Sequence, residues 1–106
     1  MKSGDASTNF SPGDVYFSQN ADDVVLVRRC LEGDQAAYEP LVRRYQRVLF
    51  NVALRILGDY AAADDATQNA FISAHRKLAS FDPNRRFFSW IYRILVNECL
   101  NTTTSR

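Results

Sequence analysis

Residues with nucleic-acid-binding chemistry recur at helical spacing near the end of the sequence. On a helical wheel of about 100° per residue they fall within about 80° of one another. They are Arg86, Trp90, Arg93, Asn97 and Asn101. Guanidinium groups neutralise phosphates, an indole ring stacks on bases, and amides hydrogen-bond to base edges. The same spacing fits a structural alternative, in which Trp90 anchors the core and the arginines are ordinary surface charges.

A second candidate surface precedes the first, in an alanine-rich segment. Asp65, Gln68 and Ile72 are separated by three and four residues, and Asn69 directly follows Gln68. On a helix this spacing forms one stripe that offers a carboxylate, amides and an apolar contact. The stripe suits docking on a protein partner, although a solvated helix face has the same pattern.

Patterns typical of enzymes are absent from the sequence. The single histidine, His75, is followed by Arg76 and Lys77 and fits a solvated helix position. Asp64 and Asp65 are adjacent, so on a helix their side chains point about 100° apart and cannot share a metal ion. The two cysteines are too few and too distant for a zinc site or a disulfide scaffold. We therefore predict no enzymatic activity, no catalytic residue, no metal and no cofactor.

The chain is long enough for one domain with a real core. It has 106 residues, of which 46% are hydrophobic, and a formal net charge of +1. That length excludes two full domains. No apolar run reaches the roughly 18 residues of a membrane helix, and the N-terminus lacks the apolar stretch of a secretory signal. We therefore expect a cytoplasmic protein without membrane insertion.

Charge is unevenly distributed along the chain. Residues 1–23 carry one lysine against four aspartates, a net charge of −3. Residues 71–106 carry six basic against two acidic residues, a net charge of +4. This asymmetry predicts that any polyanion binds at the C-terminal end of the chain.

Helical periodicity begins abruptly after a polar N-terminal stretch. Residues 1–21 are rich in Ser, Gly, Asp and Asn and predict a flexible tail. The remainder predicts an all-α fold, a compact bundle of about four helices, because no segment alternates with a period of two. The first expected helix is capped by Asp22 or Asp23 and stops at Gly33. The second runs from Asp34 to Gly58 and the third from Asp59 to Leu78. A loop at 79–85 precedes the fourth helix, at about 86–101.

Three of these helices have clear apolar faces. In the second helix, whose first turn Pro40 is expected to distort or delay, the predicted core positions are Tyr38, Leu41, Tyr45, Val48, Leu49, Val52 and Ile56. In the third helix small residues would allow close approach of a neighbour, at Ala63, Ala66, Ala70, Ala74 and Leu78. In the fourth helix the predicted core positions are Phe88, Ile91, Leu95 and Cys99.

Three motifs, in this order and spacing, resemble a known family. They are GDQAAY at Gly33–Tyr38, DATQNAF at Asp65–Phe71 and WIYRILVN at Trp90–Asn97. Together they resemble region 2, the promoter-melting domain, of bacterial extracytoplasmic-function (ECF) sigma factors of the sigma-70 family. The resemblance covers about Asp22 to Asn101.

For the third helix, the resemblance implies docking on RNA polymerase. Asp65, Gln68 and Asn69 match the positions that face the clamp helices of the polymerase β′ subunit, and Ile72 completes the stripe. Phe71 matches a family aromatic that we expect in the core. The family usually has Glu where this chain has Asn69, so we expect weaker affinity for the basic clamp helices.

For the fourth helix, the resemblance implies recognition of the −10 promoter element on the non-template strand. In that picture an unstacked base enters a pocket between the loop and the helix, lined by Phe81 and Asn97. Arg86 stands at the junction of the loop and the fourth helix. Trp90, Tyr92 and Arg93 match the family signature of that helix, and Arg93 is the expected phosphate contact.

The resemblance also implies a domain layout and a regulator. Residues 1–21 would be a tail and 22–106 the region 2 domain, without the second helical domain, region 4, that reads the −35 element in family members. An anti-sigma factor is the expected inhibitory partner. The alternative from another class is a helical adaptor that binds one protein partner and no DNA.

Overall fold

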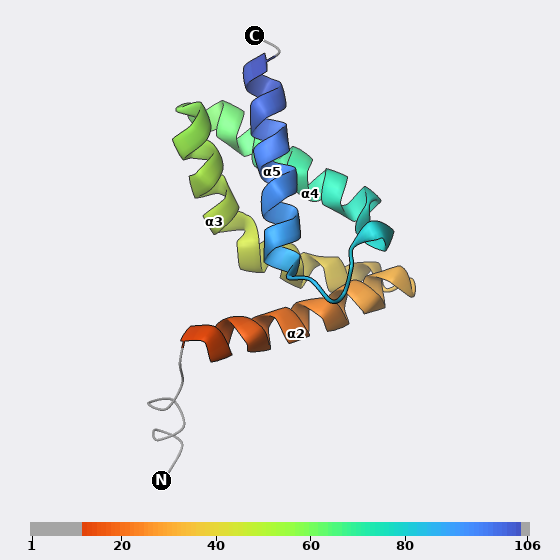
Figure 1. Ribbon diagram of the computed structural model, residues 1–106. Helices are drawn as coiled ribbons and strands as arrows, with labels where there is room; N and C mark the ends of the chain where they lie inside the picture. The colour runs from red at the N-terminus through yellow and green to blue at the C-terminus, as the bar shows by residue number, and fades with distance from the viewer. Residues whose placement is uncertain (1–11, 105–106) are drawn as a thin grey trace.

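A bundle of helices forms the described part of the chain, residues 12–104, in this computed structural model (Figure 1). The elements are α2 (Pro12–Leu31), a 3-10 turn η1 (Gln35–Ala37), α3 (Tyr38–Leu57), α4 (Tyr60–Arg76), a 3-10 turn η2 (Leu78–Ser80) and α5 (Phe87–Thr104). The helices α3, α4 and α5 pack on one another, and α2 lies across the end of the bundle where α5 begins (Figure 1). The predicted all-α class with four helices is confirmed. Among the described helices, none is both long and apolar enough to span a membrane.

The first helix begins earlier than the sequence predicted. We expected a flexible tail to residue 21 and a helix capped by Asp22 or Asp23, but α2 already begins at Pro12. Proline is favoured in the first turn of a helix, where its missing N–H costs nothing. Asp23 therefore lies inside α2 and does not cap it. The part of the predicted tail at residues 1–11 lies outside the described residues.

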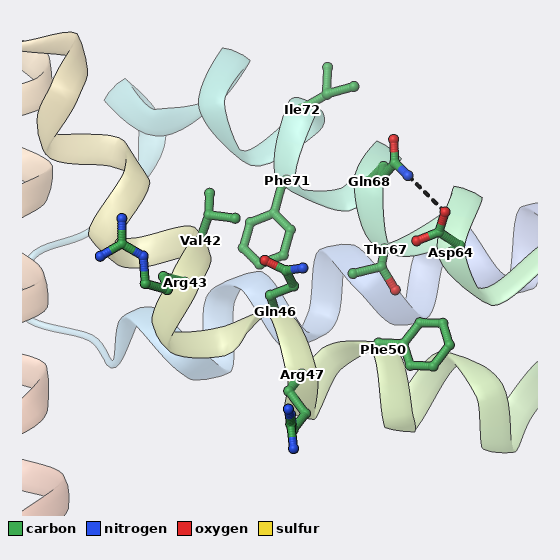
Figure 2. A pocket seen from close by; sticks show the side chains of 10 residues that line it. All are labelled: Val42, Arg43, Gln46, Arg47, Phe50, Asp64, Thr67, Gln68, Phe71 and Ile72. Carbon is green, nitrogen blue, oxygen red and sulfur yellow. Dashed lines mark hydrogen bonds between the residues drawn. The ribbon is translucent and has the colours of Figure 1, made fainter. Parts of the chain in front are cut away.

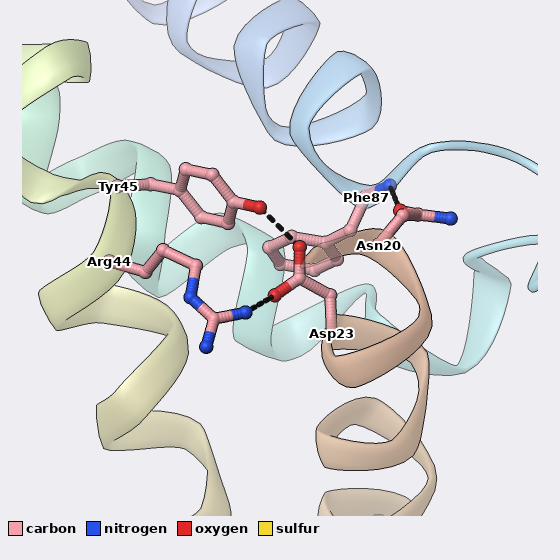
Figure 3. A network of polar contacts seen from close by, with 5 residues as sticks. All are labelled: Asn20, Asp23, Arg44, Tyr45 and Phe87. Carbon is pink, nitrogen blue, oxygen red and sulfur yellow. Dashed lines mark hydrogen bonds and ion pairs between the residues drawn. The ribbon is translucent and has the colours of Figure 1, made fainter. Parts of the chain in front are cut away.

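Asp23 instead connects α2 to α3 (Figure 3). Its carboxylate is fully buried, accepts a hydrogen bond from the Tyr45 hydroxyl, and pairs with Nη1 of Arg44 at 2.5 Å. Burial raises the pKa of the Asp23 carboxyl, while the Tyr45 hydrogen bond and the charge of Arg44 oppose that shift. These two partners offset only part of the cost of burying the charge, and their geometry fixes where α2 sits on the bundle.

The second predicted helix is divided at its start. The turn η1 precedes α3, with Pro40 in the first turn of α3, as the expected delay required. Asp34 makes no side-chain cap and pairs with Arg29 at 2.9 Å. Gly58 ends the helix in the left-handed conformation (φ 69°), where a residue without Cβ is favoured.

The buried face of α3 differs from the predicted stripe. Its buried residues are Leu41, Tyr45, Leu49 and Ala53. Val48 and Ile56, which we predicted in the core, are more than two-fifths exposed. The four buried residues are each four positions apart, so the buried face turns by about 40° per step around the α3 axis. The neighbouring helices cover this turning face, and Val48 and Ile56 lie beside it.

The third and fourth helices follow the sequence closely. Asp59 caps α4 by accepting a hydrogen bond from the Ala62 amide at 2.8 Å, and the alanine stripe is buried against the neighbouring helices. In α5 the fully buried residues are Phe87, Ile91, Leu95 and Cys99. Phe88, predicted in the core, is half-buried, and Phe87 occupies the position expected for it. The core face of α5 therefore starts one residue earlier than predicted, because the buried residues are four apart and Phe87 is four before Ile91.

Candidate interfaces on α4 and α5

A hollow lies between the loop that follows η2 and the first two turns of α5. Its volume is about 470 Å³, and we call it the loop hollow. It is lined by Ser80, Phe81, Asp82, Arg85, Arg86, Ser89, Trp90 and Arg93. The structure thus brings together Phe81, Arg86, Trp90 and Arg93, four of the residues that the sequence singled out. Arg85 also lines this hollow, although the sequence analysis did not assign it.

An aromatic cluster forms the wall of the loop hollow. Phe81 is 5% exposed, and its ring lies 5.3 Å from that of Trp90 and 5.5 Å from that of Phe87. Trp90 is half-buried, so it anchors this cluster and also lines the hollow. Trp90 therefore packs on the core, as the structural alternative requires, and also borders the hollow where a nucleic-acid contact would lie.

The loop hollow is positively charged. Three arginines and one aspartate line it, a net formal charge of +2. Asp82 lies 3.9 Å from Arg85, and both side chains are more than half exposed, so this pair neutralises little of the charge. Such a hollow attracts phosphate groups.

Asn97 lines a different hollow from Phe81. The Asn97 hollow has a volume of about 370 Å³ and lies between the end of α4 and the second half of α5. Its lining is Ser73, Lys77, Ile94, Asn97, Glu98, Leu100 and Asn101. Phe81 and Asn97 thus line separate hollows, since Asn97 is two helical turns beyond Trp90, about 10 Å along the axis. The base pocket that the resemblance places between Phe81 and Asn97 stays a prediction. The sequence signal for the opposite wall was the spacing of four between Ser73 on α4 and Lys77 directly after it.

Tyr92 stands apart from both hollows. It is 40% exposed, and its ring packs 5.8 Å from that of Phe88. The structure does not bring Tyr92 together with Arg86, Trp90 and Arg93, because it lies on another face of α5.

A groove runs between α3 and α4 (Figure 2). This α3–α4 groove has a volume of about 730 Å³ and is lined by Val42, Arg43, Gln46, Arg47, Phe50, Asp64, Thr67, Gln68, Phe71 and Ile72. Gln68 donates a hydrogen bond to Asp64 at 2.9 Å, and Ile72 is 51% exposed. Phe71 is buried, as expected of a core residue.

Only part of the predicted α4 stripe enters this groove. Gln68 and Ile72 line it, whereas Asp65 and Asn69 are exposed on α4 outside its lining. The α3 wall was missed by the sequence analysis. Its signal was the pair Arg43 and Arg47, four residues apart and flanked by apolar residues.

His75 has a structural environment. Its Nε2 lies 3.0 Å from Oε1 of Gln35, and its ring packs edge-on against Tyr38 at 4.8 Å. These contacts connect α4 to the η1 turn.

Comparisons with known proteins add a family match. The family model described as Sigma-70 region 2 matches residues 41–106. The RNA polymerase sigma-H factor of Pseudomonas aeruginosa is 37% identical over 84 residues, which are 79% of this chain and 44% of that protein. The ECF RNA polymerase sigma-E factor of Escherichia coli strain K12 is 42% identical over 86 residues, again 79% of this chain and 44% of that protein. The chain therefore spans less than half the length of these curated relatives.

Two solved structures share the fold. An engineered region 2 of sigmaE in complex with GTAAAA has a TM-score of 0.74 and 43% identity, covering 78% of this chain and 86% of that chain. CnrH in complex with the cytosolic domain of CnrY has a TM-score of 0.70 and 31% identity, covering 76% of this chain and 52% of that chain.

Proposed function

Because the chain belongs to the sigma-70 region 2 family and is of the ECF type, we propose that it binds one strand of promoter DNA along α5 and docks on RNA polymerase through α4. Proteins of this family act in transcription initiation and are not enzymes. The observation that carries the proposal is the loop hollow, where Arg86, Trp90 and Arg93 converge from one helix face.

The loop hollow suits the sugar–phosphate backbone of a single strand. Arg86 and Arg93 supply two guanidinium groups, and Trp90 supplies an aromatic ring on which a base can stack. The structural neighbour that binds GTAAAA supports this assignment, since it shares the fold at 43% identity. In this proposal the strand is the non-template strand of the −10 element, captured as the duplex melts.

The Asn97 hollow suits an unstacked base. Asn97 offers an amide that can both donate to and accept from a base edge, and Ile94 provides an apolar wall. Lys77 stands on the α4 side of the same hollow. A strand that runs along α5 from the loop hollow reaches Asn97 next. In this proposal the strand contacts two successive hollows, the loop hollow with its backbone and the Asn97 hollow with a base.

Docking on RNA polymerase is assigned to the exposed stripe on α4. Asp65, Gln68, Asn69 and Ile72 are all exposed, so they are accessible to a partner. The β′ clamp helices are the proposed partner. An adaptor without DNA binding would leave the cationic loop hollow without a role, which favours the sigma-factor proposal.

Reversing the charge of Asp65 should weaken binding to core RNA polymerase. The expected loss for Asp65→Arg is about fivefold in Kd, which corresponds to about 1 kcal/mol, while helix content stays unchanged because the side chain is exposed. The matched control is Glu32→Arg, which makes the same charge change at an exposed position after α2. Fluorescence anisotropy with purified core polymerase measures both. Equal affinity of wild type and Asp65→Arg would remove Asp65 from the interface.

The α3–α4 groove suits an inhibitory protein partner, which we propose to be an anti-sigma factor. Arg43 and Arg47 line the groove beside apolar groups of Val42, Phe50 and Ile72, so an amphipathic helix with acidic residues would match it. The structural neighbour CnrH, solved with the cytosolic domain of CnrY, supports a protein partner for this fold.

This groove adjoins the α4 stripe, so an anti-sigma factor and polymerase should compete. Adding the cytosolic domain of an anti-sigma factor that binds this chain should displace core polymerase. Arg47→Glu should abolish that displacement while leaving strand binding at α5 unchanged. Simultaneous binding of both proteins would contradict the shared site.

A further inference from the structure

The N-terminus of α5 is capped by a residue from another helix. Oδ1 of Asn20, on α2, accepts a hydrogen bond from the backbone N–H of Phe87 at 2.8 Å (Figure 3). Nδ2 of Asn20 donates to the Arg85 carbonyl at 3.4 Å. Phe87 is the first residue of α5. The first N–H groups of a helix have no partner within the helix, so a side-chain acceptor there stabilises it. Asn20 supplies this acceptor from 67 residues away.

The segment before α5 does not supply a good cap of its own. The residue that precedes α5 is Arg86, whose side chain has no acceptor. Asp82 already accepts a hydrogen bond from the Asn84 amide at 2.9 Å within the loop. The cap of α5 is therefore supplied by Asn20, a residue on another helix.

The capped residue lies beneath the loop hollow. Phe87 is fully buried, and its ring packs against those of Phe81 and Trp90, both of which line the hollow. Arg85, whose carbonyl accepts from Asn20, and Arg86, which lies between the two Asn20 contacts in sequence, also line it. Three residues after Asn20 on α2, Asp23 is anchored to Arg44 and Tyr45 of α3. The helix α2 thus connects α3 to the start of α5.

We propose that Asn20 is a positioning residue for strand binding, which sets the loop hollow by capping α5 from α2. The inference rests on the proposed function for its role in DNA binding. It concerns a helix outside the family match, which begins at residue 41. Without the cap the loop and the first turn of α5 fray, and a bound strand must order them again. The affinity for the strand then falls by at most the free energy of the cap.

Three variants of the full 106-residue chain test this inference. Asn20→Ala removes the cap. Asn20→Asp keeps an acceptor of equal capping strength for the Phe87 N–H and loses only the 3.4 Å donation to the Arg85 carbonyl. Asn51→Ala makes the same Asn-to-Ala change at an exposed position of α3. The probe is a fluorescein-labelled single-stranded GTAAAA hexamer. We expect Asn20→Ala to raise its Kd about fivefold, as a cap of typical strength allows. Asn20→Asp should remain within about twofold of wild type, and Asn51→Ala should have no effect.

A measurement without DNA separates positioning from general stability. In amide hydrogen exchange the Phe87 N–H should exchange faster in Asn20→Ala, and the emission of Trp90, the single tryptophan, should shift. In Asn20→Asp both should return to the wild-type values. Unchanged exchange at Phe87, or unchanged affinity of folded Asn20→Ala for the hexamer, would overturn the inference. Absence of hexamer binding by wild type would instead refute the proposed function, and exchange at Phe87 would still decide whether Asn20 caps α5.

Discussion

Replacing Asp23 with alanine should lower the free energy of unfolding by about 3 kcal/mol. Asp23 is fully buried, and its removal leaves the buried Tyr45 hydroxyl without its acceptor and Arg44 without its anion. Arg44 is partly exposed and can turn toward water, so the cost arises mainly from Tyr45 and from the lost contact between α2 and α3. Chemical denaturation followed by circular dichroism measures the change. The control is Asp22→Ala, at the exposed neighbouring position, which should stay within about 0.5 kcal/mol of wild type.

The pH dependence of this effect has a definite sign. Burial raises the pKa of the Asp23 carboxyl above its ordinary value, so between about pH 4 and that raised pKa the folded state binds more protons than the unfolded state. Stability contributed by Asp23 therefore falls as pH rises through that window. Compared with Asp23→Asn, which carries no titrating group, wild type should lose relative stability as pH rises above about 4 and then level off. A difference between the two proteins that rises with pH in that window would contradict the raised pKa.

Local signals were sufficient for several features of α3 and α4. The Asp59 cap, the Gly58 stop and the alanine stripe of α4 each depend on residues within a few positions of one another. Their physical causes, a capping hydrogen bond, a left-handed glycine and close helix packing, are visible in the sequence. Helical spacing alone likewise predicted that Arg86, Trp90 and Arg93 lie on one side, and all three line the loop hollow.

Long-range contacts explain what the sequence did not predict. Asp23 has the local pattern of a helix cap, and only the position of Tyr45 on another helix makes it a buried hydrogen-bond acceptor. Phe81 has the local pattern of a loop aromatic, and only the rings of Phe87 and Trp90 on α5 show that it is held inward. The α3 wall of the groove was missed for the same reason, since it becomes a surface only when α4 packs beside it.

The separation of the two hollows sharpens what mutation of α5 should do to strand binding. Arg93 lines the loop hollow, so Arg93→Ala should weaken all single strands alike. With about three phosphate contacts the slope of log affinity against log salt should be near −2, and Arg93→Ala should flatten it by about 0.7. A sequence-dependent loss in Arg93→Ala would place Arg93 on a base.

Asn97→Ala should instead abolish preference at one base position, with a loss of discrimination of about 2 kcal/mol, or about thirtyfold. Asn97 lines a hollow beside apolar Ile94, where an unstacked base loses its amide partner in the variant while the phosphate contacts at the loop hollow remain. The salt slope should therefore stay near the wild-type value. Anisotropy titrations of GTAAAA and its single-base variants measure this, with Asn51→Ala as the matched control on exposed α3. An amide that reads a flipped base must discriminate both between bases and between single strand and duplex. The Asn97 hollow would therefore not be the site of base capture if Asn97→Ala kept the wild-type base preference. Equal binding of duplex and single strand by wild type would exclude it as well.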